Sequence, residues 1–170
     1  PTAILPFKFD EHQVRKVLMT EFQQKKIDRP FIRLIHGEYF PVWTFDLSGD
    51  MVWKAMKKKA NSDDWEPISR NKLITFDDII IPASDKLDRF HQRFIRNIST
   101  AITEKFKPEY IANWVAESYN IPLAKAALNA RETAIKSSYR TIENSQVITI
   151  KDLYVNPADL HVDSFKLALI

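Results

Sequence analysis

The sequence has no cysteine and only two glycines among its 170 residues. Without cysteine, this segment has no disulfide, no thiol nucleophile and no cysteine-ligated metal site. Two glycines are too few for a Gly-rich phosphate-binding loop, and no GxxxxGK(S/T) motif occurs. Long apolar runs are missing as well, since no stretch approaches the ~18 residues that a membrane-spanning helix needs. We therefore expect no membrane span in this segment and a cytoplasmic location.

The composition that remains is that of a folded domain with a weak basic bias. Apolar residues make up 45% of the chain and charged residues 28%, both ordinary values for a globular protein. The formal net charge is +3. Nucleic-acid-binding domains are commonly basic, but so are many domains without such a partner. The charge therefore leaves the partner unknown, with nucleic acid and protein both open.

The order of hydrophobic patterns predicts the fold class. Asp10 can cap an amphipathic helix over 11–27, and residues 85–104 and 123–144 repeat apolar side chains at helical spacing. Residues 31–81 and 147–170 are rich in aromatic and β-branched residues and predict strands. Strands segregated from helices indicate an α+β fold. We expect one α+β domain over the whole chain, with a mostly antiparallel β-sheet packed against three or four helices.

Three local patterns give finer predictions within the strand-rich part. The aromatic and β-branched segment 31–34 predicts a strand. Ser48-Gly49-Asp50 predicts a turn between two strands. Pro41 lies inside the aromatic segment 39–45, and proline favours an edge or bulged position in a sheet.

The residue types that carry metal binding or acid–base catalysis are scattered or adjacent in the sequence. Adjacent carboxylates such as Asp63-Asp64 and Asp77-Asp78 point to opposite faces of a strand. The first pair is typical of a solvated loop, and Asp77 is typical of a turn or cap. We therefore predict no catalytic residue, no metal site and no cofactor in this segment. The four histidines show no HxxxH or HExxH spacing and are His12, His36, His91 and His161.

The densest basic cluster lies at a predicted hairpin tip and has tryptophans on both sides. Ammonium groups that contact phosphates and indoles that stack on bases are typical of single-stranded nucleic-acid surfaces. The alternative is a charged tip that protects a sheet edge, which we favour because both tryptophans fall in apolar strand patterns. The cluster consists of Lys54, Lys57, Lys58 and Lys59, with Trp53 and Trp65 beside it.

A second basic stripe comprises Arg89, Arg93 and Arg96, which share one face of the predicted helix. Phe90 and Phe94 lie beside it. Three arginines at this spacing can follow the phosphates of a nucleic acid. A solvated helix face explains the stripe without any ligand and is the reading that we favour.

Several segments resemble a bacterial family of zinc-ribbon-containing proteins of unknown function, often labelled primosomal protein N-prime or replication factor Y-like. The similar segments are residues 4–8, before the first predicted helix, and residues 37–46, 81–84 and 106–119. They read ILPFK, GEYFPVWTFD, IPAS and FKPEYIANWVAESY. The resemblance implies a zinc ribbon upstream of residue 1 and a further strand after residue 170. It supplies no catalytic residue to carry over.

The chain also ends within an apolar run, residues 165–170, that predicts a buried strand. We therefore expect the chain to be part of a longer protein. The leading functional hypothesis is a non-catalytic binding or scaffolding module, with nucleic acid as the first ligand to consider and another protein as the second. The alternatives are an enzyme of unrecognised class with a site among the aromatic strands, or a structural protein-interaction domain.

Overall fold

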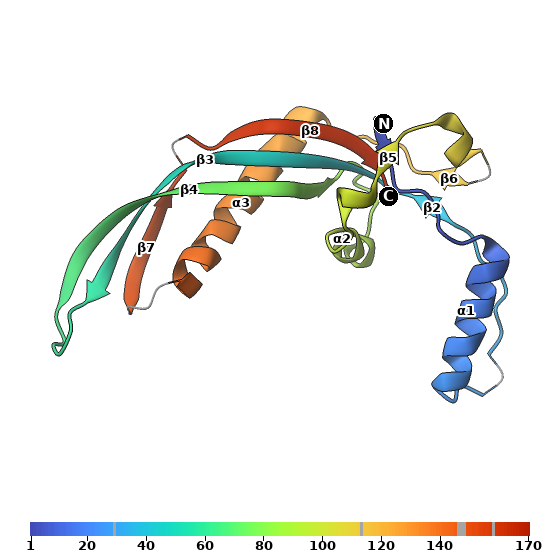
Figure 1. Ribbon diagram of the computed structural model, residues 1–170, viewed down its shortest axis with the longest axis horizontal. Helices are drawn as coiled ribbons and strands as arrows, with labels where there is room; N and C mark the ends of the chain where they lie inside the picture. The colour runs from blue at the N-terminus through green and yellow to red at the C-terminus, as the bar shows by residue number, and fades with distance from the viewer. Residues whose placement is uncertain (29, 113, 146–148, 158) are drawn as a thin grey trace.

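A long, curved β-hairpin forms the spine of the molecule in the computed structural model, which describes residues 1–28, 30–112, 114–145, 149–157 and 159–170. Its arms are β3 (Pro41–Lys58) and β4 (Trp65–Pro82), which pair antiparallel over their whole length. β8 (His161–Leu169) and β7 (Ile150–Asn156) pair antiparallel with β3 on the side away from β4 (Figure 1).

The six-stranded sheet has the order β4-β3-β8-β1-β5, with β7 added beside β3. Among its described residues β1 pairs parallel with β8, and the other pairings of this sheet are antiparallel. β2 and β6 pair parallel in a separate two-stranded sheet. The predicted α+β class with a mostly antiparallel sheet is therefore confirmed. The short strands are β1 (Ala3–Ile4), β2 (Glu38–Tyr39), β5 (Glu104–Lys105) and β6 (Val115–Ala116).

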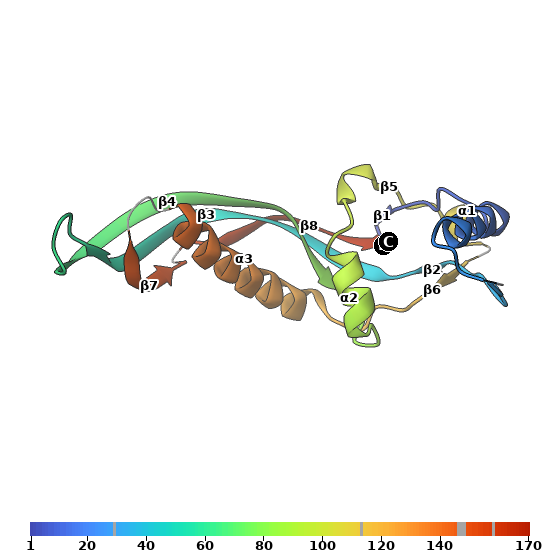
Figure 2. The ribbon, with the colours of Figure 1, turned by 90° about the horizontal axis from the view of Figure 1, so that it is seen from below.

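The helices differ in how much they pack on the sheet. α3 (Leu123–Ser145) lies along one face, and its fully buried alanines let the helix approach the strands closely (Figure 2). α1 (Glu11–Gln24) buries no residue and extends away from the sheet (Figure 1). Among the described residues, no helix is long and apolar enough to cross a membrane. The others are α2 (Arg89–Ile95) and the 3₁₀ turns η1 (Thr100–Ile102) and η2 (Pro108–Ile111).

Three β-bulges accompany the bend of the hairpin. β4 and β8 each carry an extra residue where they pass Asp46 of β3. β7 carries another between its partners for Lys54 and Met56. Asp78 and Asp152 lie in these bulges with φ of 52° each, a left-handed conformation that aspartate tolerates. Because a bulge bends and twists its strand, the three together favour the curvature seen in Figure 1.

The predicted turn at Ser48-Gly49-Asp50 is wrong, because β3 runs through it without a break. Gly49 serves another purpose. A Cβ atom built on it would lie 2.5 Å from the carbonyl oxygen of Asp159 and 2.7 Å from the Cα of Leu160. The glycine therefore lets the 159–160 backbone cross close to the strand, which is a common role for glycine inside a sheet.

Three other local predictions need correction. Segment 31–34 pairs with no strand of the described residues and runs beside α1, with the Arg15 side chain donating to the Ile32 carbonyl at 3.2 Å. Pro41 opens the central strand, where the first position needs no amide donor. The helix predicted over 85–104 shrinks to α2, capped by Asp88, because the chain then turns through η1.

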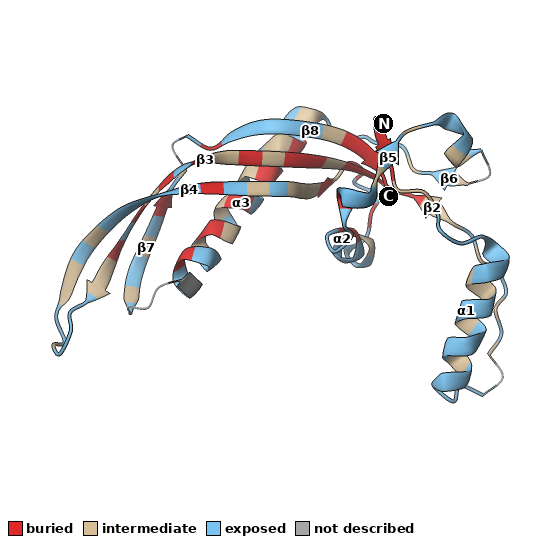
Figure 3. Cartoon of the chain, in the orientation of Figure 1, coloured by how far each residue is buried: buried red, intermediate tan, exposed pale blue. Residues whose placement is uncertain are grey.

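The two faces of the sheet are covered unequally. α3 and the face beneath it enclose the main core, which includes Phe45, Met51 and Trp53. The opposite face carries a second core near Pro41, where Leu87 and Ile95 pack on Val42. From Leu47 to the turn of the hairpin, which we call the distal half, no helix of the described residues packs on that opposite face (Figures 2 and 3).

Candidate nucleic-acid interface

Side chains of β3 alternate between the two faces in the distal half. Met51, Trp53 and Ala55 are buried beneath α3. Lys54 and Met56 lie between them in the sequence and therefore point to the opposite face, where Lys54 is exposed. The uncovered side of the distal half consequently presents the even-numbered side chains of β3.

The neighbouring strands add two aromatic rings and another lysine to that side. Lys54 is opposite Tyr154, Met56 is opposite Lys151, and Lys58 is opposite Trp65. Residues directly opposite each other in a sheet share a face. The Lys151 ammonium lies 4.2 Å from the centroid of the Trp65 ring, a cation–π contact across β3. We call the resulting surface the open face, which consists of Lys54, Lys58, Trp65, Lys151 and Tyr154.

The open face combines exposed aromatic surface with uncompensated positive charge. The Tyr154 ring is 58% exposed, although tyrosine usually gains from burial. Neither Lys54 nor Lys151 has an ion pair within the described part of the chain. Lys58 contacts Asp63 at 2.9 Å, but both side chains are solvated, so the pair stabilises the fold little.

A shallow hollow of about 520 Å³ lies within this surface. Its walls come from Lys54 and Met56 on β3 and from Pro67 and Ser69 on β4. Asp152 of β7 also borders it and is the acidic group of the lining. The lining is mainly apolar, with one cation, Lys54, and one acid, Asp152, so the hollow itself suits a flat ring, and the lysines around it supply the positive charge for the attached chain.

The structure separates the basic residues that the sequence groups at the hairpin tip. Lys57 points to the covered face and pairs with Glu66 at 3.2 Å. Lys59 lies in the turn and is exposed. Trp53 belongs to the core, as expected, with 3% of its surface exposed. Trp65, expected in the core too, is only half-buried and lies on the open face. Lys54, Lys58 and Trp65 are thus the predicted residues that come together.

Sequence reasoning missed Lys151 and Tyr154. They lie nearly a hundred residues from the hairpin tip, and only the β3–β7 pairing brings them beside it. The available signal was the alternation of side-chain types over 153–156, which in the structure leaves Tyr154 exposed and Val155 buried. That signal indicates a half-buried strand but does not say which strand is its neighbour.

The predicted arginine stripe lies at the other end of the hairpin. Arg89, Arg93 and Arg96 are all exposed on or next to α2. α2 packs near Val42, and twelve residues of strand, at ~3.3 Å each, separate Val42 from Lys54 by roughly 40 Å along the curved β3. The two predicted basic clusters therefore do not form one continuous surface.

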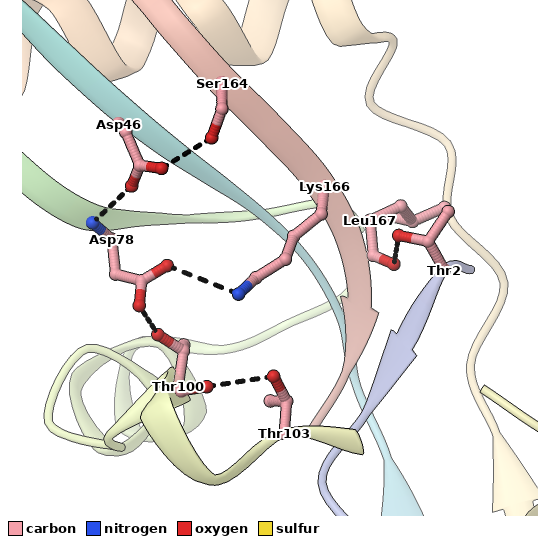
Figure 4. Close-up of polar contacts among 8 residues, drawn as sticks. All are labelled: Thr2, Asp46, Asp78, Thr100, Thr103, Ser164, Lys166 and Leu167. Carbon is pink, nitrogen blue, oxygen red and sulfur yellow. Dashed lines mark hydrogen bonds and ion pairs between the residues drawn. The ribbon is translucent and has the colours of Figure 1, made fainter. Parts of the chain in front are cut away.

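The bulges also gather three carboxylates, those of Asp46, Asp77 and Asp78, with one oxygen of each lying within 4.8 Å of the others. Figure 4 shows two of them, Asp46 and Asp78. Asp46 accepts hydrogen bonds from the Ser164 hydroxyl at 2.5 Å and from the Asp78 amide at 3.0 Å. These two donors, the hydroxyl first, hold the pKa of Asp46 below its usual value. The negative charges of Asp78 and Asp46 raise the pKa of Asp77.

This acidic cluster joins separate elements where the sheet bends. Asp78 accepts a hydrogen bond from Thr100 of η1, and the Lys166 ammonium of β8 lies 3.6 Å from its other oxygen (Figure 4). Carboxylate oxygens are ligands for Mg²⁺ and Ca²⁺, so within the described residues these three groups could hold a hard cation. Their contacts instead link β3, β4, β8 and η1. The expected absence of a metal site stays a prediction. Asp77, expected in a turn or cap, lies instead in the bulge of β4.

No family model matches the chain, and no curated protein or solved structure matches it. The resemblance to zinc-ribbon proteins, and the zinc ribbon that it implies, therefore stay predictions.

Proposed function

We propose that this chain is a non-catalytic binding module whose open face binds single-stranded nucleic acid. The observation that carries the proposal is the Lys151–Trp65 contact, which lies beside Tyr154 and Lys54 on a sheet face that no helix of the described residues covers. Bases stack on exposed aromatic rings, and ammonium groups neutralise the phosphates that connect them.

The spacing of the two rings suits a strand of several nucleotides. Trp65 and Tyr154 are separated by four residues along the sheet and by two strand spacings across it. Standard strand geometry converts this into roughly 16 Å. The two rings therefore stack on different bases of one strand, and Lys54 and Lys151 lie between them for the intervening phosphates.

Sequence-independent binding follows from the chemistry of the open face. Aromatic rings stack on all four bases, because every base has a π face. Ammonium groups contact phosphates as point charges and carry no base information. The proposal is therefore affinity for single strands with little sequence preference and a strong dependence on salt.

The test is a salt titration of oligothymidylate and oligouridylate of about twelve nucleotides, a length within the range that such surfaces cover. Wild type is compared with Trp65→Ala, Tyr154→Ala and Lys54→Gln/Lys151→Gln. Each aromatic removal should weaken binding by about 5- to 150-fold, the equivalent of 1–3 kcal/mol per stacked base. The double lysine variant should flatten the salt slope by about 1.4, or ~0.7 per lost contact.

Two controls separate stacking and local charge from general effects. Lys16→Gln/Arg33→Gln removes two exposed cations near α1, so it changes the net charge equally but leaves the open face intact. Trp65→Phe keeps an aromatic ring and should retain most of the affinity. No binding at low salt, or the same loss in the Lys16/Arg33 control, would refute the proposal.

A further inference from the structure

Two hollows lie side by side around α2, away from the open face. The first, of about 520 Å³, is lined by α2 and the two residues after it. The second, of about 440 Å³, lies between α2 and the first half of α3. Arg96 and Gln92 border both, so the hollows adjoin each other. Five cations line them and define what we call the cradle: Arg89, Arg93, Arg96, Lys125 and Lys136.

The cations of the cradle come from two helices, and on each helix their spacing places them on the side that lines the hollows. Arg89 and Arg93 are four residues apart on α2, and Arg96 follows at its C-terminal cap. Lys125 and Lys136 are eleven residues apart on α3, which is three turns of an α-helix. Because α2 and α3 come from separate parts of the chain, only the folded structure creates this concentration of charge.

The acids of the cradle leave most of this positive charge uncompensated. Asp85 accepts a hydrogen bond from the Asn120 amide at 2.5 Å. Glu132 accepts one from the Lys136 ammonium at 2.6 Å. Within the described residues no ion pair involves Lys125 or any of the three arginines, which are Arg89, Arg93 and Arg96.

Crowded like charges on a short helix are unfavourable unless an anion joins them. A like-charge pair at this spacing costs a helix a few tenths of a kcal/mol. Guanidinium groups present paired N–H donors whose geometry matches two oxygens of a phosphate. Two adjoining hollows, each bordered by Arg96, accommodate more than one phosphate. We propose that the cradle binds an anion that carries at least two linked phosphate groups.

The cradle is independent of the proposed nucleic-acid function. Its second hollow is bounded by α3, which covers the face opposite to the open face. Linked phosphates can come from a nucleic-acid backbone or from a free polyphosphate, and both share the chemistry that the arginines recognise. If the open face does not bind nucleic acid, the proposal for the cradle is unaffected. If the cradle does not bind linked phosphates, the proposal for the open face is unaffected.

The test is calorimetric titration with sodium tripolyphosphate at low salt, followed by oligothymidylate in place of the tripolyphosphate. Arg93→Gln/Arg96→Gln should weaken tripolyphosphate binding by about tenfold or more, because it removes two charge-assisted contacts. Lys125→Gln, on the other helix, should weaken it several-fold and so guards against a local defect of α2. Lys16→Gln/Arg33→Gln and Lys54→Gln/Lys151→Gln should leave it unchanged.

The oligonucleotide identifies the source of the phosphates. If Arg93→Gln/Arg96→Gln weakens both ligands, the cradle accepts a nucleic-acid backbone. If it weakens tripolyphosphate alone, the cradle is specific for a free polyphosphate. Both results support the site. Absence of tripolyphosphate binding, or an equal loss in the Lys16/Arg33 control, would overturn it.

Discussion

The covered face and the open face of the distal half are built from alternate residues of the same strands, yet they have opposite chemistry. Beneath α3, Met51, Trp53 and Val155 are almost completely buried. One position along, Lys54 and Tyr154 are exposed. The comparison shows that one strand of this protein contributes both to the core and to an exposed surface, because alternate side chains of a strand point to opposite faces.

The two tryptophans at the tip show the same contrast within one residue type. Trp53 lies in the core, and Trp65 lies half-buried under a lysine. An indole in a core contributes packing, whereas an indole beside ammonium groups and partly open to solvent offers a stacking surface. The predictions below test this difference between the faces.

The largest loss of folding stability is expected from Trp53→Ala. Removing a buried indole beneath α3 leaves a cavity and should lower the free energy of unfolding by about 3–5 kcal/mol. Trp65→Ala should cost less than half as much, because its ring is already partly solvated. Urea denaturation followed by circular dichroism measures both. Equal losses for the two variants would contradict the difference between the faces.

A smaller loss of folding stability is expected from Gly49→Ala. The added methyl would overlap the Asp159 carbonyl, and the backbone must shift to relieve the contact. Overpacking of this kind costs about 1–3 kcal/mol. Ser48→Ala, one residue along and on the opposite side of β3, is the matched control and should change the urea midpoint little. A neutral Gly49→Ala would show that the crossing backbone is not closely packed.

Two carboxylates at the bend, those of Asp46 and Asp77, should affect the stability of the fold in opposite directions as the pH changes. The folded-state pKa of Asp46 is lowered, so its stabilisation is present above the unfolded pKa of about 3.9 and is lost as pH falls through the folded value. The folded-state pKa of Asp77 is raised by its neighbours, so its ionised form opposes folding near neutral pH.

Asp46→Asn should therefore lower the urea midpoint near pH 7, and Asp77→Asn should raise it. Both differences from wild type should shrink at pH values below the folded pKa of Asp46. Urea titrations at several pH values measure these effects. If both variants shift the midpoint the same way near pH 7, the acidic cluster does not have the charge arrangement described for it.

The smallest effect on stability is expected from Lys151→Gln. An exposed cation–π contact contributes about 0.5–1 kcal/mol, so the urea midpoint should fall only slightly. Oligonucleotide affinity should fall further, because the same lysine is proposed to contact a phosphate. Comparing the two losses in one variant separates the structural from the functional role of Lys151. A stability loss larger than the binding loss would favour a purely structural contact.

Local patterns predicted much of the secondary structure. The N-cap of α1 at Asp10, the extent of α3 and the turn between Lys58 and Trp65 follow from capping, periodicity and turn residues. The strand predicted from Val147 lies partly outside the described residues, and β7 is described from Ile150. These features depend on residues near one another in the sequence, which is why they could be predicted.

Features that depend on distant partners could not be predicted in the same way. Gly49 looks like a turn residue until the 159–160 backbone is seen to cross it. The helix predicted to reach residue 104 stops at Ile95, after which η1 places Thr100 against Asp78. Lys151 joins the open face only through strand pairing. In each case a contact across the sheet overrides the local preference.

The most direct test of the open face is a nucleic-acid titration followed on tryptophan indole N–H resonances. The chain has four tryptophans, which are Trp43, Trp53, Trp65 and Trp114. Protein labelled with ¹⁵N at tryptophan gives one indole signal for each, and Trp65→Phe assigns the one that matters. Oligothymidylate should shift the Trp65 signal in a saturable, salt-sensitive way and leave the Trp53 signal in place. An unmoved Trp65 signal at saturating oligothymidylate would contradict the account.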